Sequence, residues 1–308
     1  MSILKAILLK LVSTLLFAVM GALVRWLGDS VPLGQVVFFR SAFAILPVVL
    51  IYALRRELAA AVRTKRPFGH FGRGLIGAAG MFFSFAALAR LPLADVTAIS
   101  FAAPLITVAM AAVLLKERVG IYRWSAVAVG LVGVIVMLAP RLSIGELSGM
   151  TAAATIGALC AAGSAVTNAG SVIQTRRLTD TETTSSIVFY FSFFCALAGL
   201  LSLPFGWIAP SPLQLAALIM VGVIGGVSHL LLTESYRYAP ASVVAPFDYT
   251  AMLWAFLLGY ALFGELPDVF IVIGAAIVVG AGLFVIWRER QLGLERAQEK
   301  AAGSPIAG

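Results

Sequence analysis

Charged side chains are scarce in this sequence of 308 residues. Only 12% of the residues are Asp, Glu, Lys or Arg, whereas 61% are hydrophobic, and the mean hydropathy is +1.02. An average soluble domain carries about 25% charged residues, so the composition excludes a soluble globular protein and indicates one embedded in a lipid bilayer. The net charge of +8 does not indicate a nucleic-acid partner, because the basic residues occupy short gaps between apolar runs.

Motifs for metal binding and ATP hydrolysis are missing as well. Cys160 and Cys195 both lie inside apolar runs, where buried thiols are expected rather than a disulfide. No metal-ligand spacing occurs, and we expect neither a metal nor a cofactor. The phosphate loop G-x-x-x-x-G-K-[ST] does not occur, which argues against ATP as a driving force.

An intramembrane enzyme is the least favoured interpretation. Ser228, His229 and Asp248 offer a nucleophile, a base and an orienting carboxylate. Neighbouring side chains on a helix point about 100° apart, which makes the adjacent Ser and His a poor catalytic pair. The nucleophile motif G-x-S-x-G is also missing. The sequence therefore predicts no enzyme.

What the sequence does contain is a series of long apolar runs. A helix of about 20 apolar residues crosses the hydrocarbon core of a bilayer, and turn and charge signals such as "RRELAAAVRTKRPFGH" and "TRRLTDTE" separate the runs. The pattern predicts an all-α membrane protein with ten transmembrane helices. They are predicted at residues 4–27, 33–54, 72–89, 94–115, 122–139, 149–173, 185–206, 212–235, 241–263 and 268–287.

The distribution of Lys and Arg predicts the orientation of these spans. With the N-terminus inside, the inner loops and tails hold most of the basic residues, including Lys10 and Arg73, whereas only Arg25, Arg90 and Arg141 fall outside. Basic residues favour the cytoplasmic side, so both termini are predicted to be cytoplasmic. Residues 288–308 are then expected to form a solvated cytoplasmic tail that is helical at first.

The two halves of the chain resemble each other. Pro92 in "LPLADV" precedes Glu117 in "LLKE" by 25 residues, and Pro240 in "APASVV" precedes Glu265 in "LFGE" by 25 residues, which gives an offset of 148. Earlier in each half the offset is 151, since "VFFRS" at 37–41 matches "VFYFS" at 188–192. Five helices per repeat reverse the direction of the second copy. We therefore expect two inverted five-helix repeats, at 1–140 and 149–287, as in many transporters.

Other features resemble a known family. In each half the fourth span ends in Glu before a short turn ("LLKERVG", "LFGELPD"), and the fifth is rich in glycine ("AVAVGLVGVIVML", "IGAAIVVGAGLFVI"). With the ten spans and the repeat, this pattern resembles the EamA group of the drug/metabolite transporter superfamily. Its members include amino-acid exporters, riboflavin importers and S-adenosylmethionine carriers. The resemblance implies a central cavity that opens alternately to each side of the membrane, and it does not imply a substrate.

Ionisable groups inside the spans are the first candidates for a site, because charge within a bilayer is costly. Arg40 lies about 10 Å below the outer boundary, where it is a candidate for binding an anionic group of a substrate, or alternatively an internal counter-ion. Its repeat equivalent is Phe191, so the charge is not required by the fold of both halves. His229 and Asp248 are expected at similar inner depths, where they could form a proton relay or a structural hydrogen-bonded pair.

Polar and aromatic neighbours complete the predicted site. Asn168 on the sixth span is a candidate hydrogen-bond donor to substrate, with an interhelical contact as the alternative. Tyr249 and Trp254 lie near Asp248, and aromatic rings there would favour a flat aromatic or zwitterionic substrate, although packing against lipid is the alternative for each.

The remaining acidic residues and the glycines are given structural roles. Glu117 and Glu265 recur at equivalent positions and are expected to cap or bond the start of the following helix. Asp95 and Glu234 are expected to be solvated caps at span ends. Glycine stripes such as "GLIGAAG" are expected to allow close approach of helices.

These observations predict a secondary transporter that moves a small metabolite across the inner membrane by alternating access. The driving force would be a proton, a counter-substrate or the substrate gradient. A riboflavin-like compound or an amino acid is favoured as substrate, and S-adenosylmethionine or another metabolite is the alternative. An alternative of another class is a membrane scaffold or regulatory partner that moves no solute. The predicted partners are a small molecule and the bilayer, with no nucleic acid; direction and oligomeric state are not specified.

Overall fold

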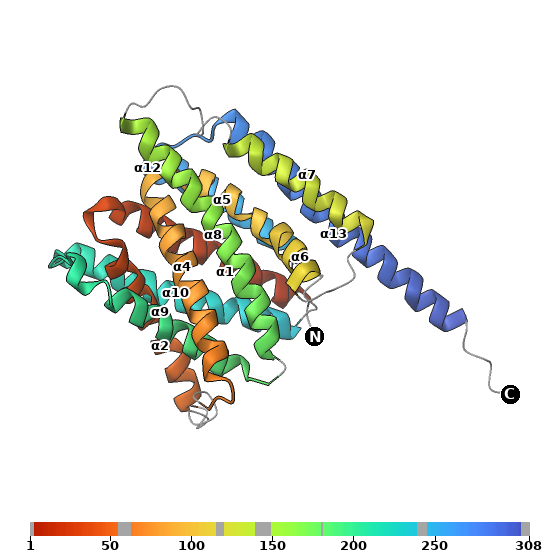
Figure 1. Cartoon of the computed structure of the whole chain (residues 1–308), viewed down its shortest axis with the longest axis horizontal. Coiled ribbons are helices and arrows are strands. Elements are labelled where there is room, and N and C mark those ends of the chain that lie inside the picture. Colours follow the sequence, from red (N-terminus) through yellow and green to blue (C-terminus); the bar gives the residue numbers. More distant parts are fainter. Residues whose placement is uncertain are drawn as a thin grey trace.

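The computed structural model describes residues 3–54, 63–114, 120–138, 149–179, 181–238 and 245–302, and these residues are almost entirely helical. Lipid offers no hydrogen bonds to a backbone, and a helix satisfies its own backbone groups internally. The helices form a bundle in which α7 and α13 lie side by side along one flank, and α13 continues past the bundle (Figure 1).

The first half of the chain contributes five apolar segments. The elements are α1 (Ile3–Leu27), η1 (Gly28–Ser30), α2 (Leu33–Leu54), α4 (Pro67–Arg90), α5 (Leu93–Ser100), α6 (Ala102–Leu114) and α7 (Ile121–Leu138).

The second half contributes five more. The elements are α8 (Gly149–Thr179), α9 (Thr184–Leu200), η3 (Leu203–Phe205), α10 (Pro212–Tyr238), η4 (Ala245–Tyr249), α12 (Thr250–Phe263) and α13 (Val269–Ala302).

The ten predicted spans correspond one by one to apolar helical segments of the described residues. Six segments are long and apolar enough to cross a membrane, and four are shorter apolar helices. The long segments are Leu4–Leu27, Pro67–Arg90, Leu93–Leu114, Ala152–Thr175, Pro212–Leu232 and Val269–Arg288, and the shorter ones are Leu33–Pro47, Trp124–Leu138, Ser186–Leu200 and Phe247–Phe263.

Local sequence signals explain several helix ends. Pro67 occupies the first turn of α4, where the missing N–H costs nothing. Thr183 caps α9, since its hydroxyl accepts a hydrogen bond from the Ser186 N–H at 3.2 Å. Gly264 ends α12 in the left-handed region, with a φ of 65°, which a residue without a Cβ adopts without strain. Because α4 begins at Pro67, the span predicted to begin at residue 72 is longer than expected.

Two predicted spans are interrupted. The helix of residues 93–114 breaks at Phe101, where α5 passes into α6, and the span predicted at 241–263 begins as the 3-10 helix η4 before α12 takes over at Thr250. Under the offset of 148, Phe101 corresponds to Tyr249, so both breaks fall at equivalent positions of the two halves. The rings of Phe101 and Tyr249 are in contact, with 5.1 Å between their centroids.

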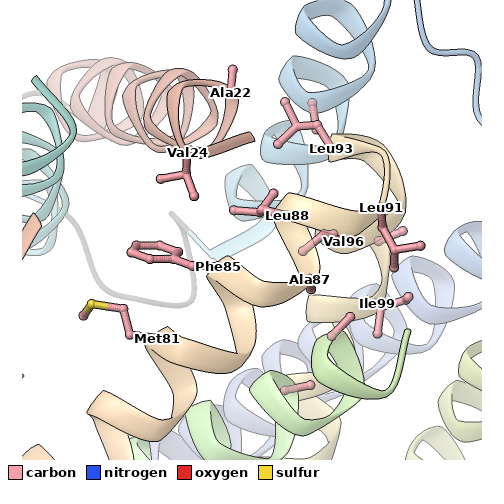
Figure 2. Close-up of a cluster of buried hydrophobic side chains, with 14 of the residues drawn as sticks. Ala22, Val24, Met81, Phe85, Ala87, Leu88, Leu91, Leu93, Val96 and Ile99 are labelled. Atoms are coloured by element: carbon pink, nitrogen blue, oxygen red, sulfur yellow. The ribbon is translucent and has the colours of Figure 1, made fainter. Parts of the chain in front are cut away.

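A buried apolar core fills one end of the bundle. The end that carries Arg25, Leu93 and Glu265 is called the Glu265 end below. Figure 2 shows part of this core, with side chains of α1, α4 and α5 gathered around the chain reversal between α4 and α5. These side chains are 9% exposed or less, so this part of the bundle is tightly packed. The labelled members are Ala22, Val24, Met81, Phe85, Ala87, Leu88, Leu91, Leu93, Val96 and Ile99.

Close helix approach at glycine is confirmed where α7 meets α13. A Cβ added to Gly133 would lie 2.8 Å from the carbonyl oxygen of Gly274, so a side chain there would force the helices apart. In α4, a Cβ on Gly77 would overlap the ring of Phe191 from α9. The glycine stripe of α4 therefore seats aromatic side chains of α9.

The C-terminal segment is helical beyond the predicted span. The described part of α13 runs to Ala302, so the beginning of the predicted tail continues the last transmembrane helix. Residues 303–308 lie outside the described residues, as does Glu117, for which a structural role is predicted.

Candidate functional site

The described residues line a partly open cavity of about 490 Å³ between helices of both halves. Its volume falls within the range of about 300 to 1,000 Å³ that is typical of small-molecule sites. Six helices contribute to its wall, which contains cationic, amide, hydroxyl and aromatic side chains but no Asp or Glu among the described lining residues. The wall consists of Phe17, Met20, Arg40, Ala44, Arg73, Gly77, Gly80, Met81, Ser84, Phe85, Asn168, Ser171, Val172, Val188, Phe191, Ser192, Gly226, His229 and Leu230.

Arg40 of α2 faces this cavity, as the sequence predicts for a binding group. Its side chain is 5% exposed, and it makes no hydrogen bond or ion pair with any described residue. It passes over Gly225 of α10, where an added Cβ would lie 3.4 Å from the Arg40 Nε. A buried guanidinium carries five N–H donors and a full charge, so Arg40 presents unused donors to whatever enters the cavity.

Arg73 of α4 is a second cation in the wall, although the distribution of basic residues predicted it in an inner loop. Its Nε donates to the Thr175 hydroxyl at 2.7 Å, and its Cζ lies 4.2 Å from the centroid of the Phe191 ring. Its Nη1 is buried with no hydrogen-bond partner among the described residues. The prediction was wrong because α4 begins at Pro67, which places Arg73 almost two turns inside the helix.

Two more predicted residues line the same cavity. His229 of α10 meets the ring of Phe17 edge to face, with 4.9 Å between centroids. Asn168 of α8 reaches the wall beside Gly80, where an added Cβ would lie 3.4 Å from the Asn168 Oδ1. The structure thus brings together Arg40, Asn168 and His229 from three helices.

Asp248 is not among the residues that line the cavity. Its Oδ1 lies 2.6 Å from Nζ of Lys10, whose side chain is 1% exposed, whereas that of Asp248 is 46% exposed. Lys10 was expected in an inner loop or tail, but it lies within α1, because its charge is compensated by this carboxylate. The predicted pairing of Asp248 with His229 is replaced by an ion pair between α1 and η4.

Tyr249 and Trp254 also lie away from the cavity wall. Tyr249 packs against Phe101, and its hydroxyl occupies the space that a Cβ on Gly282 of α13 would need. The indole nitrogen of Trp254 is buried and has no hydrogen-bond partner in the described part of the chain. Tyr249 thus contacts both Phe101 of the first half and α13 of its own half.

A polar cluster holds the Glu265 end together. Glu265 accepts hydrogen bonds from Arg25 Nε at 2.6 Å and from the Leu93 N–H at 3.2 Å, and it also contacts Arg25 Nη2. The Arg25 Nη1 donates to the carbonyl of Leu88 at 3.0 Å and to that of Leu91. The prediction was that Glu265 bonds the start of the helix that follows it. Instead, it bonds the start of α5, in the other half of the chain.

Asp95 differs from the prediction in a similar way. The sequence indicates a solvated cap, but the Asp95 side chain is 1% exposed. The reason is that α5 is covered by α8 and α12, which a hydropathy pattern does not reveal. Glu234, the other predicted cap, is half-buried in α10.

Glu182, in the turn between α8 and α9, organises the opposite end of the bundle. Its carboxylate accepts hydrogen bonds from the Lys65 N–H at 2.7 Å, the Arg66 N–H at 2.9 Å and the Thr64 hydroxyl at 3.1 Å. Nε2 of the buried His70 lies 3.3 Å from the Glu182 Oε2. Burial opposes ionisation of Glu182, but these hydrogen bonds outweigh burial and lower its pKa.

The sequence matches a known transporter family in both halves. The profile of the EamA-like transporter family matches residues 4–139 and 155–287. The chain belongs to the EamA-like transporter family. It is therefore a multi-pass membrane protein that transports a small molecule, as the resemblance in the sequence implied.

Curated relatives of this EamA-like transporter carry different substrates according to their names. The chain is 30% identical to an S-adenosylmethionine uptake transporter of Rickettsia prowazekii over 287 residues, which cover 92% of each protein. It is 29% identical to a pseudopaline exporter of Pseudomonas aeruginosa, covering 89% of this chain and 93% of that protein. It is 30% identical to a riboflavin transporter of Rhizobium johnstonii, covering 89% and 88%. The relatives include importers and exporters.

A solved crystal structure shares the fold of this EamA-like transporter. The match has a TM-score of 0.62 and covers 93% of this chain and 98% of the other chain, at 21% sequence identity. This similarity concerns the arrangement of helices and carries no information on the substrate.

Proposed function

We propose that this protein is a secondary transporter that carries a metabolite across the inner membrane by alternating access, with both termini in the cytoplasm. The observation that carries the proposal is the central cavity. It lies between helices of both halves, holds buried polar side chains, and is separated from the Glu265 end by a packed apolar core. A cavity closed on one side is the arrangement that alternating access requires.

Two inverted five-helix repeats, residues 1–140 and 149–287, are part of this proposal. Several elements begin at equivalent positions: α2 and α9 at residues 33 and 184, α6 and α12 at 102 and 250, and α7 and α13 at 121 and 269. These pairs differ by the offsets of 151 and 148 found in the sequence. Equivalent helices also pack against each other, as α7 does with α13 and α2 with α9. Both observations support a two-fold relation between the halves.

The proposed orientation places the Glu265 end at the outer side of the membrane. The segments at the opposite end carry Lys65, Arg66 and Arg177, and basic residues favour the cytoplasm. The cavity would then be closed toward the outside by the Glu265 cluster and the core around it. Release of that cluster would open the cavity outward, while the contacts of Glu182 would hold the cytoplasmic end.

The site residues have two proposed roles. Arg40, Asn168 and His229 bind the substrate, since all three line the cavity. Asp248 takes part in proton coupling through its ion pair with Lys10, because protonation of the carboxylate would release the buried lysine. Replacing Asp248 by Asn should abolish the dependence of transport on a pH gradient while exchange continues. Unchanged pH dependence with normal flux would exclude this role.

An aromatic or zwitterionic metabolite is the proposed substrate class. Phe17, Phe85 and Phe191 supply flat apolar surfaces, and the guanidinium and amide groups of the wall would hold charged or polar substituents. The riboflavin and S-adenosylmethionine transporters among the relatives support compounds with a flat ring system. For Tyr249 and Trp254, predicted to contact substrate, the proposed role is packing around η4 and α12.

Transport is tested with purified protein in liposomes. A panel of labelled amino acids, flavins and nucleoside-like compounds is offered, and uptake is compared with that of protein-free liposomes. We expect saturable uptake of at least one compound and competition by its unlabelled form. The absence of flux for every compound, with protein that is folded and correctly inserted, would favour the scaffold alternative.

A further inference from the structure

The central cavity contains two cations that have no acidic partner among the described residues. Arg40 is 5% exposed and unbonded to the described residues, and Arg73 has a buried Nη1 without a partner among them. None of the described lining residues is Asp or Glu. A buried charge without a counter-ion is costly, so the cavity is electrostatically incomplete until an anion enters it.

The two cations act on the same space. Arg40 of α2 and Arg73 of α4 both belong to the wall of this one cavity. The cavity therefore lies under the influence of two positive charges at once, in surroundings where water screens them poorly.

The two arginines approach the cavity from different depths. The Ser41 hydroxyl next to Arg40 lies 3.7 Å from the Met81 Sδ, which places Met81 of α4 level with Arg40. Arg73 lies eight residues before Met81 on the same helix, which is about 12 Å along its axis. The two arginine side chains thus start from two separated levels of the wall, an arrangement that suits a ligand with acidic groups at two positions.

The second cation is held in place by its neighbours. Arg73 donates one hydrogen bond to Thr175 and stacks on Phe191, and its remaining donors are available to a ligand. Phe191 is the repeat equivalent of Arg40. At this position the first half therefore contributes the cation Arg40, and the second half contributes the ring that orients Arg73. A planar fork fixed in this way is suited to carboxylate or phosphate.

We propose that the substrate carries two acidic groups, one bound by Arg40 and the other by Arg73, with an aromatic or apolar body between them. This proposal rests on the transport function proposed above and narrows its substrate class. It disfavours compounds whose net charge is positive, because the described wall offers no carboxylate to a cationic group.

Binding is measured with purified protein and probes that differ only in charge. N-benzoylglutamate, terephthalate and suberate are each compared with their monoamides and diamides by ligand titration of thermal unfolding. A charge-assisted hydrogen bond contributes enough to change affinity by about tenfold to a hundredfold. We expect at least one dianion to bind about tenfold more tightly than its monoamide, and the monoamide more tightly than the diamide.

Variants assign each acidic group to its arginine. In Arg40→Gln and in Arg73→Gln the dianion should bind no better than its monoamide, whereas Arg40→Lys and Arg73→Lys should keep part of the preference. Arg90→Gln is the matched control, because Arg90 is on α4, outside the cavity wall, and bonds only the Ala86 carbonyl among the described residues. A merely structural arginine would lower the affinity for all probes alike.

Two outcomes overturn the proposal. One is that no dianion binds better than its diamide to the wild-type protein. The other is that the preference for the dianion over its monoamide is undiminished in Arg40→Gln or in Arg73→Gln. Failure of transport is distinguishable, since dianion binding without flux in liposomes contradicts the transport proposal and leaves the two-anion site intact. Flux of a neutral or cationic compound without dianion binding contradicts only the two-anion site.

Discussion

Replacing Glu265 by Gln is expected to loosen the closed end of the bundle. The amide keeps the size of the side chain and an oxygen that accepts from the Leu93 N–H, but it removes the charge that pairs with Arg25. The guanidinium keeps its hydrogen bonds to the carbonyls of Leu88 and Leu91. The substitution therefore removes the ion pair together with its hydrogen bonds from Arg25, and leaves the other contacts between the two halves in place.

The magnitude follows from the burial of the pair. The side chains of Arg25 and Glu265 are 19% and 14% exposed, so the pair is neither fully exposed nor fully buried. Exposed ion pairs contribute about 0.2 to 1 kcal/mol, and disruption of a buried pair costs about 3 to 5 kcal/mol. A loss of about 2 kcal/mol is expected. If the open state lacks the contact, the ratio of closed to open molecules falls about 30-fold, since each 1.4 kcal/mol is about a factor of ten.

The assay is labelling of a cysteine placed in the core that closes this end. Val24 is 2% exposed, and Val24→Cys is introduced into a chain in which Cys160 and Cys195 are replaced by Ala. A membrane-impermeant thiol reagent is applied to oriented vesicles from the side where the proposed orientation places the Glu265 end. Glu265→Gln should speed labelling by about tenfold or more, whereas Glu182→Gln, which loosens the opposite end, should not. Equal labelling with and without Glu265→Gln would refute the role of this ion pair in closure.

Three further predictions concern stability. Gly77→Ala forces a Cβ into the ring of Phe191 and should lower the free energy of unfolding by about 1 to 3 kcal/mol. The control is Gly280→Ala, where an added Cβ meets nothing within 4 Å and the free energy of unfolding should change by less than about 0.5 kcal/mol. Equal effects of the two variants in thermal unfolding would contradict the packing of α4 against α9. Asp248→Asn removes the carboxylate that pairs with the buried Lys10 and should cost about 1 to 2 kcal/mol. Adding Lys10→Met should recover part of this loss, so a double variant no more stable than the single one would argue against the pair. The pKa of Glu182 is lowered from its ordinary value of 4.5, so its stabilising contacts should be complete above pH 4.5 and be lost as the pH falls through the lowered pKa. Hydrogen exchange of the amides that donate to Glu182, corrected for intrinsic rates, should therefore become faster on acidification of the wild type. In Glu182→Ala this exchange should be fast at all pH values.

The sequence was sufficient to predict the helices and part of the site. Apolar runs and turn signals located all ten segments, because a chain in lipid must satisfy its backbone within a helix wherever it crosses. Arg40, Asn168 and His229 were found because a polar group inside a long apolar run is costly and faces a cavity or a partner.

The errors have a common physical cause. Lys10 and Arg73 were counted with the inner loops and tails when the basic residues were used to orient the spans. Only the tertiary structure shows a carboxylate beside one and an aromatic ring beside the other. Asp248 was matched with His229 on similar depth alone. Depth along a helix follows from sequence, but the face that a side chain presents depends on how neighbouring helices are rotated and where they break, as at η4.

The central claim is that a small molecule crosses the membrane through the cavity that Arg40 lines. Its most direct test is an untargeted comparison of metabolites inside and outside cells that produce wild type, Arg40→Gln or the control Arg90→Gln. We predict that wild type and Arg90→Gln shift one small set of metabolites in opposite directions in cells and medium, and that Arg40→Gln returns that set to the level of cells without the protein. An identical shift with Arg40→Gln at equal protein abundance in the membrane would contradict the claim.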